Sequence, residues 1–128
     1  MIAADTSTWI AFFSGAEGED VDRLDDALQD RLLTMPPPVL SELLSDPKMS
    51  ADLEATLREV PLLDTSDGYW ARAGRLRGSV LARRRKARLG DALIAQSCLD
   101  HRLPLLTLDR DFMAFADAAG LDLVVSRK

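Results

Sequence analysis

The chain has 128 residues, a formal net charge of -5 and a hydrophobic content of 47%. This length predicts one domain spanning residues 1–128, and this hydrophobic content excludes a globally disordered protein. No apolar run approaches the roughly 20 residues that a membrane-spanning helix needs. The single cysteine, Cys98, has no disulfide partner within the chain. We therefore expect a soluble protein of a reducing compartment, most simply the cytoplasm, with no membrane partner.

Short apolar runs alternate along the chain with stretches of helical periodicity. The apolar runs predict five strands, at residues 2–4, 33–35, 60–63, 104–108 and 121–125. The periodic stretches predict helices at residues 8–13, 21–32, 39–44, around 53–57, after the capping residues 64–67, from 89 or 90 to 99, and at 109–119. Pro61 places the third strand at an edge, because proline cannot donate to a ladder. This alternation predicts a parallel α/β sheet that is covered on both faces.

Four carboxylates stand beside apolar sequence. Asp5 follows the first predicted strand, Asp109 follows the fourth, and Glu42 and Asp91 fall near the starts of two helices. Ligands of a parallel α/β sheet bind outside the carboxyl ends of its strands, where the strand order reverses. Converging carboxylates need a cation to stay ionised together, and oxygen ligands favour Mg2+ or Mn2+. Each acid alone is also explained as a helix cap, but the four together favour a divalent-metal site.

The residues and motifs of several other enzyme classes are absent from the sequence. His101 is the only histidine, which excludes a two-histidine ribonuclease, and too few Cys and His residues are present for a zinc site. Neither a phosphate-binding GxxxxGK[ST] motif nor a dinucleotide-binding GxGxxG motif occurs. Because Asp5 is followed by Thr6 and Ser7, the sequence fits neither a phosphatase of the haloacid-dehalogenase type nor a phosphoacceptor domain.

Four short motifs carry a family resemblance: Asp5-Thr6-Ser7, Ser41-Glu42-Leu43, Gly90-Asp91-Ala92-Leu93-Ile94-Ala95 and Thr107-Leu108-Asp109-Arg110-Asp111-Phe112. In their order and spacing the chain resembles the PIN-domain ribonucleases, specifically the VapC-type toxins of bacterial toxin–antitoxin pairs. The resemblance covers essentially the whole chain. It implies a Rossmann-like three-layer α/β/α sandwich with a mostly parallel sheet, and an endoribonuclease that depends on Mg2+ or Mn2+.

The resemblance also implies roles for individual residues. Asp5, Glu42, Asp91 and Asp109 would form the catalytic quartet, and Asp111 would be a fifth member. Our mechanistic hypothesis places the metal on Asp5, Asp91 and Asp109, with Asp109 and Asp111 as alternatives for one ligand. Thr6 or Ser7 would orient the Asp5 carboxylate or a metal-bound water, and Thr107 would support Asp109. Attack by an activated water would leave 5′-phosphate and 3′-hydroxyl ends.

The resemblance implies further partners, namely an RNA substrate, a cognate antitoxin protein and a second copy of the chain in a homodimer. Two alternatives to a toxin stay open, a catalytically weak PIN-like module that binds RNA or protein, and a nuclease of RNA maturation. The chain carries a basic stripe, defined by Arg72, Arg75, Arg77, Arg83, Arg84, Arg85, Lys86 and Arg88, with no acid among residues 72–88. It suggests RNA contacts by Arg84, Arg85 and Arg88, the alternative being a solvated helix face.

The aromatic residues are expected to serve mainly as core. Trp9 and Phe13 fall on one helix face, where core packing is the default and a groove for an antitoxin helix is the alternative. Trp70, Phe112 and Phe115 are predicted to be buried in the core.

Overall fold

The computed structural model describes residues 1–124, so Val125 of the last predicted strand lies outside the described residues. Over this range the chain forms a parallel sheet of four strands in the order β2-β1-β3-β4. The strands are β1 (Ile2–Ala4), β2 (Leu33–Thr34), β3 (Leu105–Leu106) and β4 (Leu123–Val124). The sheet is short, and β1 and β3 at its centre carry residues with no exposed surface: Ala3, Ala4, Leu105 and Leu106.

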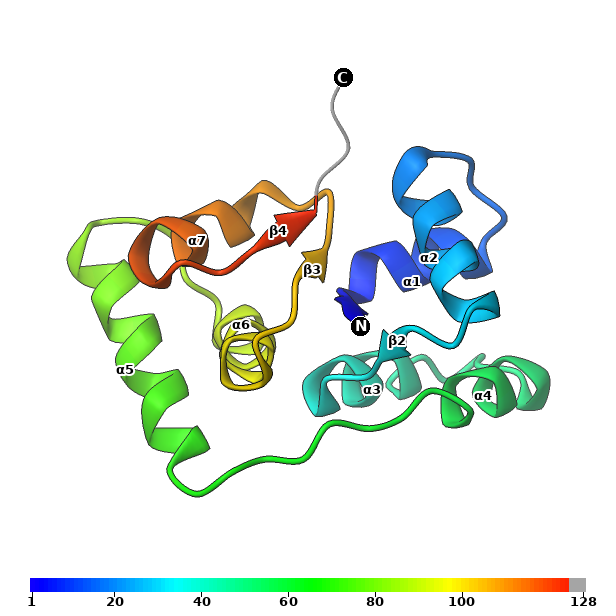
Figure 1. Cartoon of the computed structure of the whole chain (residues 1–128), viewed down its shortest axis with the longest axis horizontal. Coiled ribbons are helices and arrows are strands. Elements are labelled where there is room, and N and C mark those ends of the chain that lie inside the picture. Colours follow the sequence, from blue (N-terminus) through cyan, green and yellow to red (C-terminus); the bar gives the residue numbers. More distant parts are fainter. Residues whose placement is uncertain (125–128) are drawn as a thin grey trace.

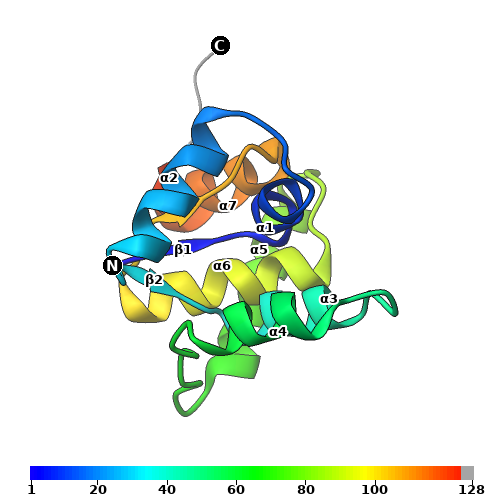
Figure 2. The same cartoon turned by 90° about the vertical axis from the view of Figure 1, so that its right-hand side faces the viewer.

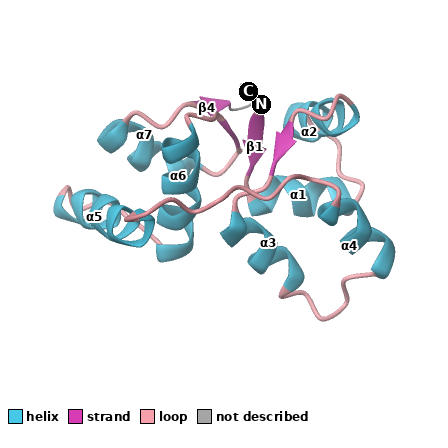
Figure 3. Ribbon diagram, turned by 60° about the horizontal axis from the view of Figure 1, so that its bottom comes forward, coloured by secondary structure: helices cyan, strands magenta, loops and turns pink. Residues whose placement is uncertain are grey.

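Helices flank the strands and complete a three-layer α/β/α fold, as predicted. Figure 3 shows the strands in the middle of the molecule, with α5, α6 and α7 to the left and α1 to α4 to the right. The helices are α1 (Thr6–Phe13), α2 (Glu19–Gln29), α3 (Pro37–Leu44), α4 (Ala51–Arg58), α5 (Tyr69–Ala82), α6 (Leu89–His101) and α7 (Met113–Ala119), with a 3-10 turn η1 (Arg110–Phe112) before α7. None of these helices has the length and apolar character that crossing a membrane requires.

The three consecutive prolines separate β2 from α3. Pro36 has the extended backbone of an N-cap residue, and Pro37 occupies the first helical position, where a missing N–H costs nothing. The helix therefore begins two residues earlier than the periodicity predicts, at residue 37 rather than 39. The position of α3 matters because this helix carries Glu42.

The predicted third strand is reduced to a single bridge. Leu62 pairs in parallel with Met35, just beyond β2. Met35 N–H donates to Pro61 O at 2.8 Å, and Leu63 N–H donates to Met35 O at 2.9 Å. The segment therefore lies at the sheet edge, as predicted, but Pro61 lacks the N–H that a longer ladder would use. It belongs to the extended connection from α4 to α5, which runs along the bottom of Figure 1.

Most of the aromatic predictions are confirmed, but the prediction for Trp70 is wrong. Trp9 has no exposed surface, and Phe112 and Phe115 are each 1% exposed, whereas Trp70 is 67% exposed. The buried positions of α5 are Tyr69, Ala73, Leu76 and Val80. Trp70 follows Tyr69 by one residue, so the helix turns its side chain about 100° away from that buried stripe, as a period of about 3.6 residues per turn requires.

The burial of β3 generates a stability prediction. Leu105 has no exposed surface and lies between β1 and β4. Leu105→Ala should lower the free energy of unfolding by about 2–5 kcal/mol, because the substitution leaves a cavity in the sheet core. Urea unfolding followed by circular dichroism measures this change.

The matched control is Leu108→Ala, which removes the same atoms three residues later from a side chain that is 43% exposed. Its effect should stay below about 1 kcal/mol, as for surface substitutions generally. Equal losses for the two variants would contradict the placement of β3 at the centre of the core.

Candidate metal centre

The acidic residues gather where the strand order reverses. The chain passes from β1 to β2 on one side of β1, then returns to place β3 on its other side. Asp5 directly follows β1, and Thr107 directly follows β3. Asp5 N–H donates to Leu106 O at 3.1 Å, which ties the two strand ends together. Figure 2 shows β1 running above α6 and leading into α1. This edge of the sheet is where ligands of parallel α/β proteins bind.

Asp5 is a buried carboxylate whose oxygens are fully engaged. It is 2% exposed and caps α1 by accepting the Thr8 N–H at 2.9 Å. The hydroxyl of Ser7 donates to both of its oxygens, at 3.0 and 2.9 Å, and that of Thr107 donates to Oδ2 at 2.5 Å. Burial raises the pKa of Asp5, and these hydrogen bonds oppose the rise. Asp5 therefore does cap α1, which was the simple explanation of this acid in the sequence. It also lies at the sheet edge where the strand order reverses, which we call the strand switch.

Asp91, Asp109 and Asp111 form the group with metal-ligand spacing. One carboxylate oxygen of each lies within 4.8 Å of the others. Asp91 Oδ2 is buried without a hydrogen-bond partner among the described residues. The pKa of Asp91 is raised to about 6, chiefly by burial and also by the charges of Asp109, Glu42 and Asp111, while Arg88 opposes the rise. An orphaned carboxylate oxygen beside two more carboxylates is a donor set that fits Mg2+ or Mn2+.

A cavity of about 190 Å³ joins this group to the rest of the quartet. Its lining includes Asp5, Glu42, Asp91 and Asp109, so the structure brings together the four acids predicted from the sequence, while Asp111 stands just outside the lining. The other lining residues are Thr6, Ser7, Ile10, Arg88, Ile94 and Phe112. The exposed Ile10 and the buried Phe112 border the cavity without any catalytic signal in their sequence positions.

Glu42 reaches the cavity from α3 and is fixed by a neighbour on α1. The hydroxyl of Thr6 donates to Glu42 Oε1 at 2.5 Å, so Thr6 positions the second acid of the quartet, whereas Ser7 is the one of this pair of residues that bonds Asp5. The other oxygen, Oε2, lies over Gly90, where an added Cβ would be 3.4 Å away. The start of α6 and the end of the Glu42 side chain are therefore neighbours at the cavity.

Thr107 acts on two of the acids. Its hydroxyl donates to Asp5 and accepts the N–H of Asp109 at 2.9 Å. Asp109 in turn caps η1 by accepting the Asp111 N–H at 2.9 Å. The capping interpretation thus applies to Asp5 and Asp109. Neither α3 nor α6 has a side-chain cap, but Asp91 lies in the first turn of α6, where the helix dipole favours an acid, whereas Glu42 lies outside the first turn of α3.

The basic stripe is partly neutralised by acids from distant segments. Arg85 pairs with Asp117 at 2.5 Å, and Lys86 pairs with Asp111 at 3.1 Å. Arg88, the last residue of the stripe, lines the acidic cavity. Arg84 is exposed, at a left-handed backbone position with φ 59°. The Lys86–Asp111 pair was missed from the sequence, because nothing in a run of four basic residues indicates which of them meets an acid.

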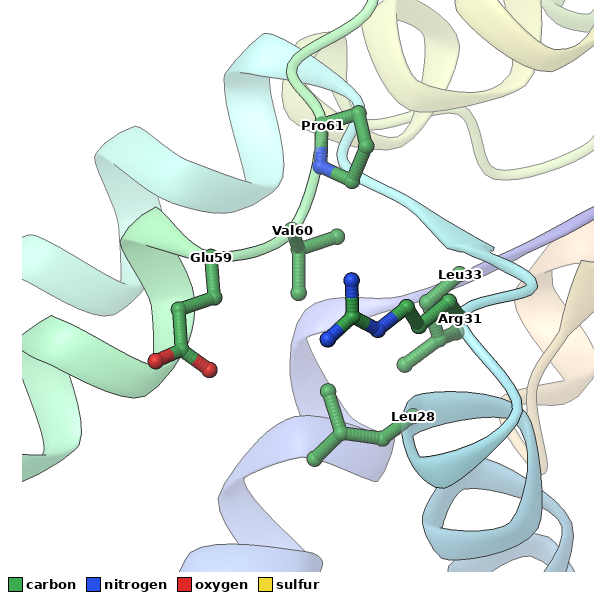
Figure 4. Close-up of a pocket in the computed structure, with 6 residues that line it drawn as sticks. All are labelled: Leu28, Arg31, Leu33, Glu59, Val60 and Pro61. Carbon is green, nitrogen blue, oxygen red and sulfur yellow. The ribbon is translucent and has the colours of Figure 1, made fainter.

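A larger cavity, about 480 Å³, lies away from these acids. It is lined by residues of α2, of β2 and of the segments that follow α2 and α4, and the Arg31 side chain extends between Leu28 and Val60 (Figure 4). None of the predicted site residues lines it, so size alone does not locate the chemistry of this protein.

Comparison with known proteins identifies the family of this chain. The family model of the PIN domain matches residues 2–119, and the chain therefore belongs to the PIN-domain family, which confirms the resemblance seen in its motifs. No curated protein shows significant sequence similarity to the chain.

Solved structures share the fold. A chain of the crystal structure of VapBC2 from Rickettsia felis, bound to a DNA fragment from the promoter, is 19% identical with a TM-score of 0.74, and the match covers 99% of this chain and 100% of that one. A chain of VapBC-5 from Mycobacterium tuberculosis, a member of the VapBC family of toxin–antitoxin systems, is 24% identical with a TM-score of 0.68 and 98% coverage of both. A chain of a toxin–antitoxin complex from Klebsiella pneumoniae is 21% identical, with a TM-score of 0.68 and coverage of 98% and 97%.

The raised pKa of Asp91 predicts how stability depends on pH without metal. The folded protein holds this proton up to about pH 6, whereas the ordinary pKa of an aspartate is 3.8. The folded protein binds the Asp91 proton more tightly than the unfolded chain does. The protonated carboxyl group is therefore fully compatible with folding below pH 4, and the free energy of unfolding falls as the pH rises through 6 and this group ionises. Asp91→Asn should raise the free energy of unfolding at neutral pH by about 1–2 kcal/mol, after allowing for the open side of the cavity.

Urea unfolding in a chelating buffer, repeated between pH 4 and pH 7, measures the difference between wild type and Asp91→Asn. The control is Asp26→Asn, an exposed acid on α2. The Asp91 difference should grow with pH and should exceed the Asp26 difference at pH 7, and a constant Asp91 difference would contradict the raised pKa of Asp91.

Proposed function

We propose that this chain is a divalent-metal-dependent endoribonuclease and acts as the toxin of a toxin–antitoxin pair. The observation that carries the proposal is the acidic cavity at the strand switch, which joins Asp5, Glu42, Asp91 and Asp109 around an unpartnered carboxylate oxygen. Membership of the PIN-domain family supports a nuclease. The structural neighbours, which are chains of toxin–antitoxin complexes, support the toxin assignment.

Mg2+ or Mn2+ would be held by Asp91, Asp109 and Asp111, with Asp5 beside them. The bound cation supplies a Lewis acid, which polarises a phosphoryl oxygen and lowers the pKa of water. Because Lys86 already neutralises Asp111, a cation has to compete with this ammonium group for that carboxylate. Asp91 and Asp109 would therefore be the more available ligands at this end of the site, and Asp111 would contribute in place of its ion pair with Lys86.

The chain's own residues would orient the substrate and the attacking water. Glu42 is held at Oε1 by Thr6, so its other oxygen is available to accept a proton from water. Arg88 lies on the same cavity and would contact a phosphate oxygen. Arg84 and Arg85 would extend this contact along the RNA backbone. Attack by water rather than by a ribose 2′-hydroxyl leaves 5′-phosphate and 3′-hydroxyl ends.

The proposed setting is the cytoplasm, where a cognate antitoxin protein would block the activity. We propose a homodimer as the working unit, as the family resemblance implies.

RNA cleavage by the purified chain tests the proposal. Wild-type protein should cut RNA with Mg2+ or Mn2+ and should lose at least about 100-fold of that rate with a chelator, a loss of several kcal/mol of transition-state stabilisation. Asp5→Asn, purified in the same way, should show no cleavage and so guards against a contaminating ribonuclease. Products with 2′,3′-cyclic phosphate ends would rule out the water mechanism.

A second readout separates a nuclease from a binding module. Mn2+ should raise the melting temperature of the wild type but not of Asp91→Asn, because only an intact site binds the ion. The control, Asp122→Asn, changes an exposed acid outside the cavity and should respond like the wild type. A metal response without cleavage of any RNA would favour the catalytically weak module.

The position of Arg88 predicts a change in salt dependence. Arg88→Ala should weaken RNA binding and reduce the slope of log Kd against log salt by about one unit or less, since one phosphate contact is lost. Fluorescence anisotropy with a labelled RNA at several salt concentrations gives this slope.

The matched control is Arg23→Ala on α2, where the arginine pairs with Glu19 at 3.2 Å on an exposed helix face. This variant should bind RNA like the wild type. If Arg88→Ala leaves the salt slope unchanged, the residue serves only to offset the charge of Asp91.

A further inference from the structure

A second cavity adjoins the acidic one and differs from it in chemistry. Its volume is about 310 Å³, and its surface is almost entirely apolar. Glu42 lines both cavities. The two are further linked by α6, which contributes Asp91 to one and Leu93 to the other. The apolar cavity therefore adjoins the place where a phosphate of the proposed RNA substrate would lie.

Trp70 forms an exposed wall of this second cavity. Its ring meets that of Tyr69 in a T-shaped contact, with centroids 5.1 Å apart and planes at 77°. Tyr69 is 1% exposed, and its hydroxyl donates to Leu93 O at 2.6 Å. The indole is thus braced against a fixed aromatic residue while 67% of Trp70 stays accessible. A large aromatic side chain left in solvent beside a hollow offers a flat surface for another ring.

We propose that the Trp70 cavity takes an unpaired nucleobase of the RNA, next to the phosphate held at the acidic cavity. The proposal rests on the proposed function, because it assumes that RNA occupies the neighbouring site. A base suits this cavity since it is flat, largely apolar on its faces and polar at its edge, and stacking on an aromatic side chain is sequence-tolerant. The hydroxyls of Ser41 and Thr65 also line the cavity and can bond the edge of a base.

The charge of the cavity excludes a phosphate group as its occupant. Its one ionised lining residue is Glu42, which would repel an anion. A phosphate would instead lie on the side of Arg88, which lines only the acidic cavity of the two. The pair of cavities thus separates the two parts of a nucleotide, with the backbone at the charged cavity and the base at the apolar one.

This arrangement selects a class of substrate. A base that is paired and stacked inside an A-form helix cannot lie on Trp70, whereas a base in a loop or a single strand can be splayed out. The protein should therefore prefer RNA whose nucleotide beside the cut is unpaired.

Substitution of Trp70 tests the proposal on the full chain. In a chelating buffer, which prevents cleavage, Trp70→Ala and Trp70→Leu should raise the Kd for a labelled single-stranded RNA by roughly 5- to 150-fold. Trp70→Phe should keep most of the affinity, because the ring is retained. Leu62→Ala removes another exposed apolar side chain, 54% exposed, and should bind like the wild type.

Two further readouts support or overturn the same proposal. Because Trp9 is fully buried, quenching of tryptophan fluorescence on RNA binding should come from Trp70 and should disappear in Trp70→Phe. Sedimentation of wild type and Trp70→Ala should give the same oligomeric state. Dissociation of an oligomer by Trp70→Ala would instead make this surface an interface between copies of the chain and overturn the proposal.

The outcomes also separate this proposal from the proposed function. If wild type cuts RNA with metal but Trp70→Ala and Trp70→Leu bind RNA as tightly as wild type, the base site is wrong and the nuclease stands. If wild type neither binds nor cuts RNA, the nuclease fails and the base site fails with it.

Discussion

The hydrogen bond from Thr107 to Asp5 is the constraint on which the rest of the site depends. It joins residues that are 102 positions apart, at the carboxyl ends of the two central strands. The same hydroxyl accepts the N–H of Asp109, and the same carboxylate caps α1. One buried contact therefore sets the direction of a helix, the entry to η1 and the spacing of two acids. The remaining acids arrive on α3 and α6, which pack against each other and place Glu42 and Asp91 on the same cavity.

The acids of the cavity repel one another and are partly buried, which destabilises the metal-free protein, but together they form a set of oxygen ligands. Asp91 has an unpartnered carboxylate oxygen, and its pKa is raised first by burial and then by the charges of the neighbouring acids. Lys86 and Arg88 relieve part of this repulsion from the end of the basic stripe. The stripe thus serves two roles in the proposed mechanism, because residues that attract an RNA backbone also steady the acids that a metal would bind.

The sequence predicted features that depend on local pattern. Strand runs followed at once by an acid located Asp5 and Asp109, and helical periodicity located α5 and α6. It did not predict features set by tertiary packing. Thr6 bonds Glu42 across 36 residues, and Lys86 pairs with Asp111, but neither partner leaves a local signal. Trp70 was assigned to the core on its residue type alone, although its position one residue after Tyr69 already placed it off the buried stripe.

The pairing of β1 with β3 also affects when the sheet can be completed while the chain is being synthesised. Ala3 and Leu105 are register partners, so one edge of the first strand pairs with β2 while its other edge lacks a partner until about 100 residues later. Such distant contacts form late, because closing a long loop costs entropy before the contact is gained. On the ribosome the first half of the chain emerges with an unpaired strand edge and without its third and fourth acids. The acidic cavity is therefore completed only when almost the entire polypeptide has been made, and a partial chain carries no finished site.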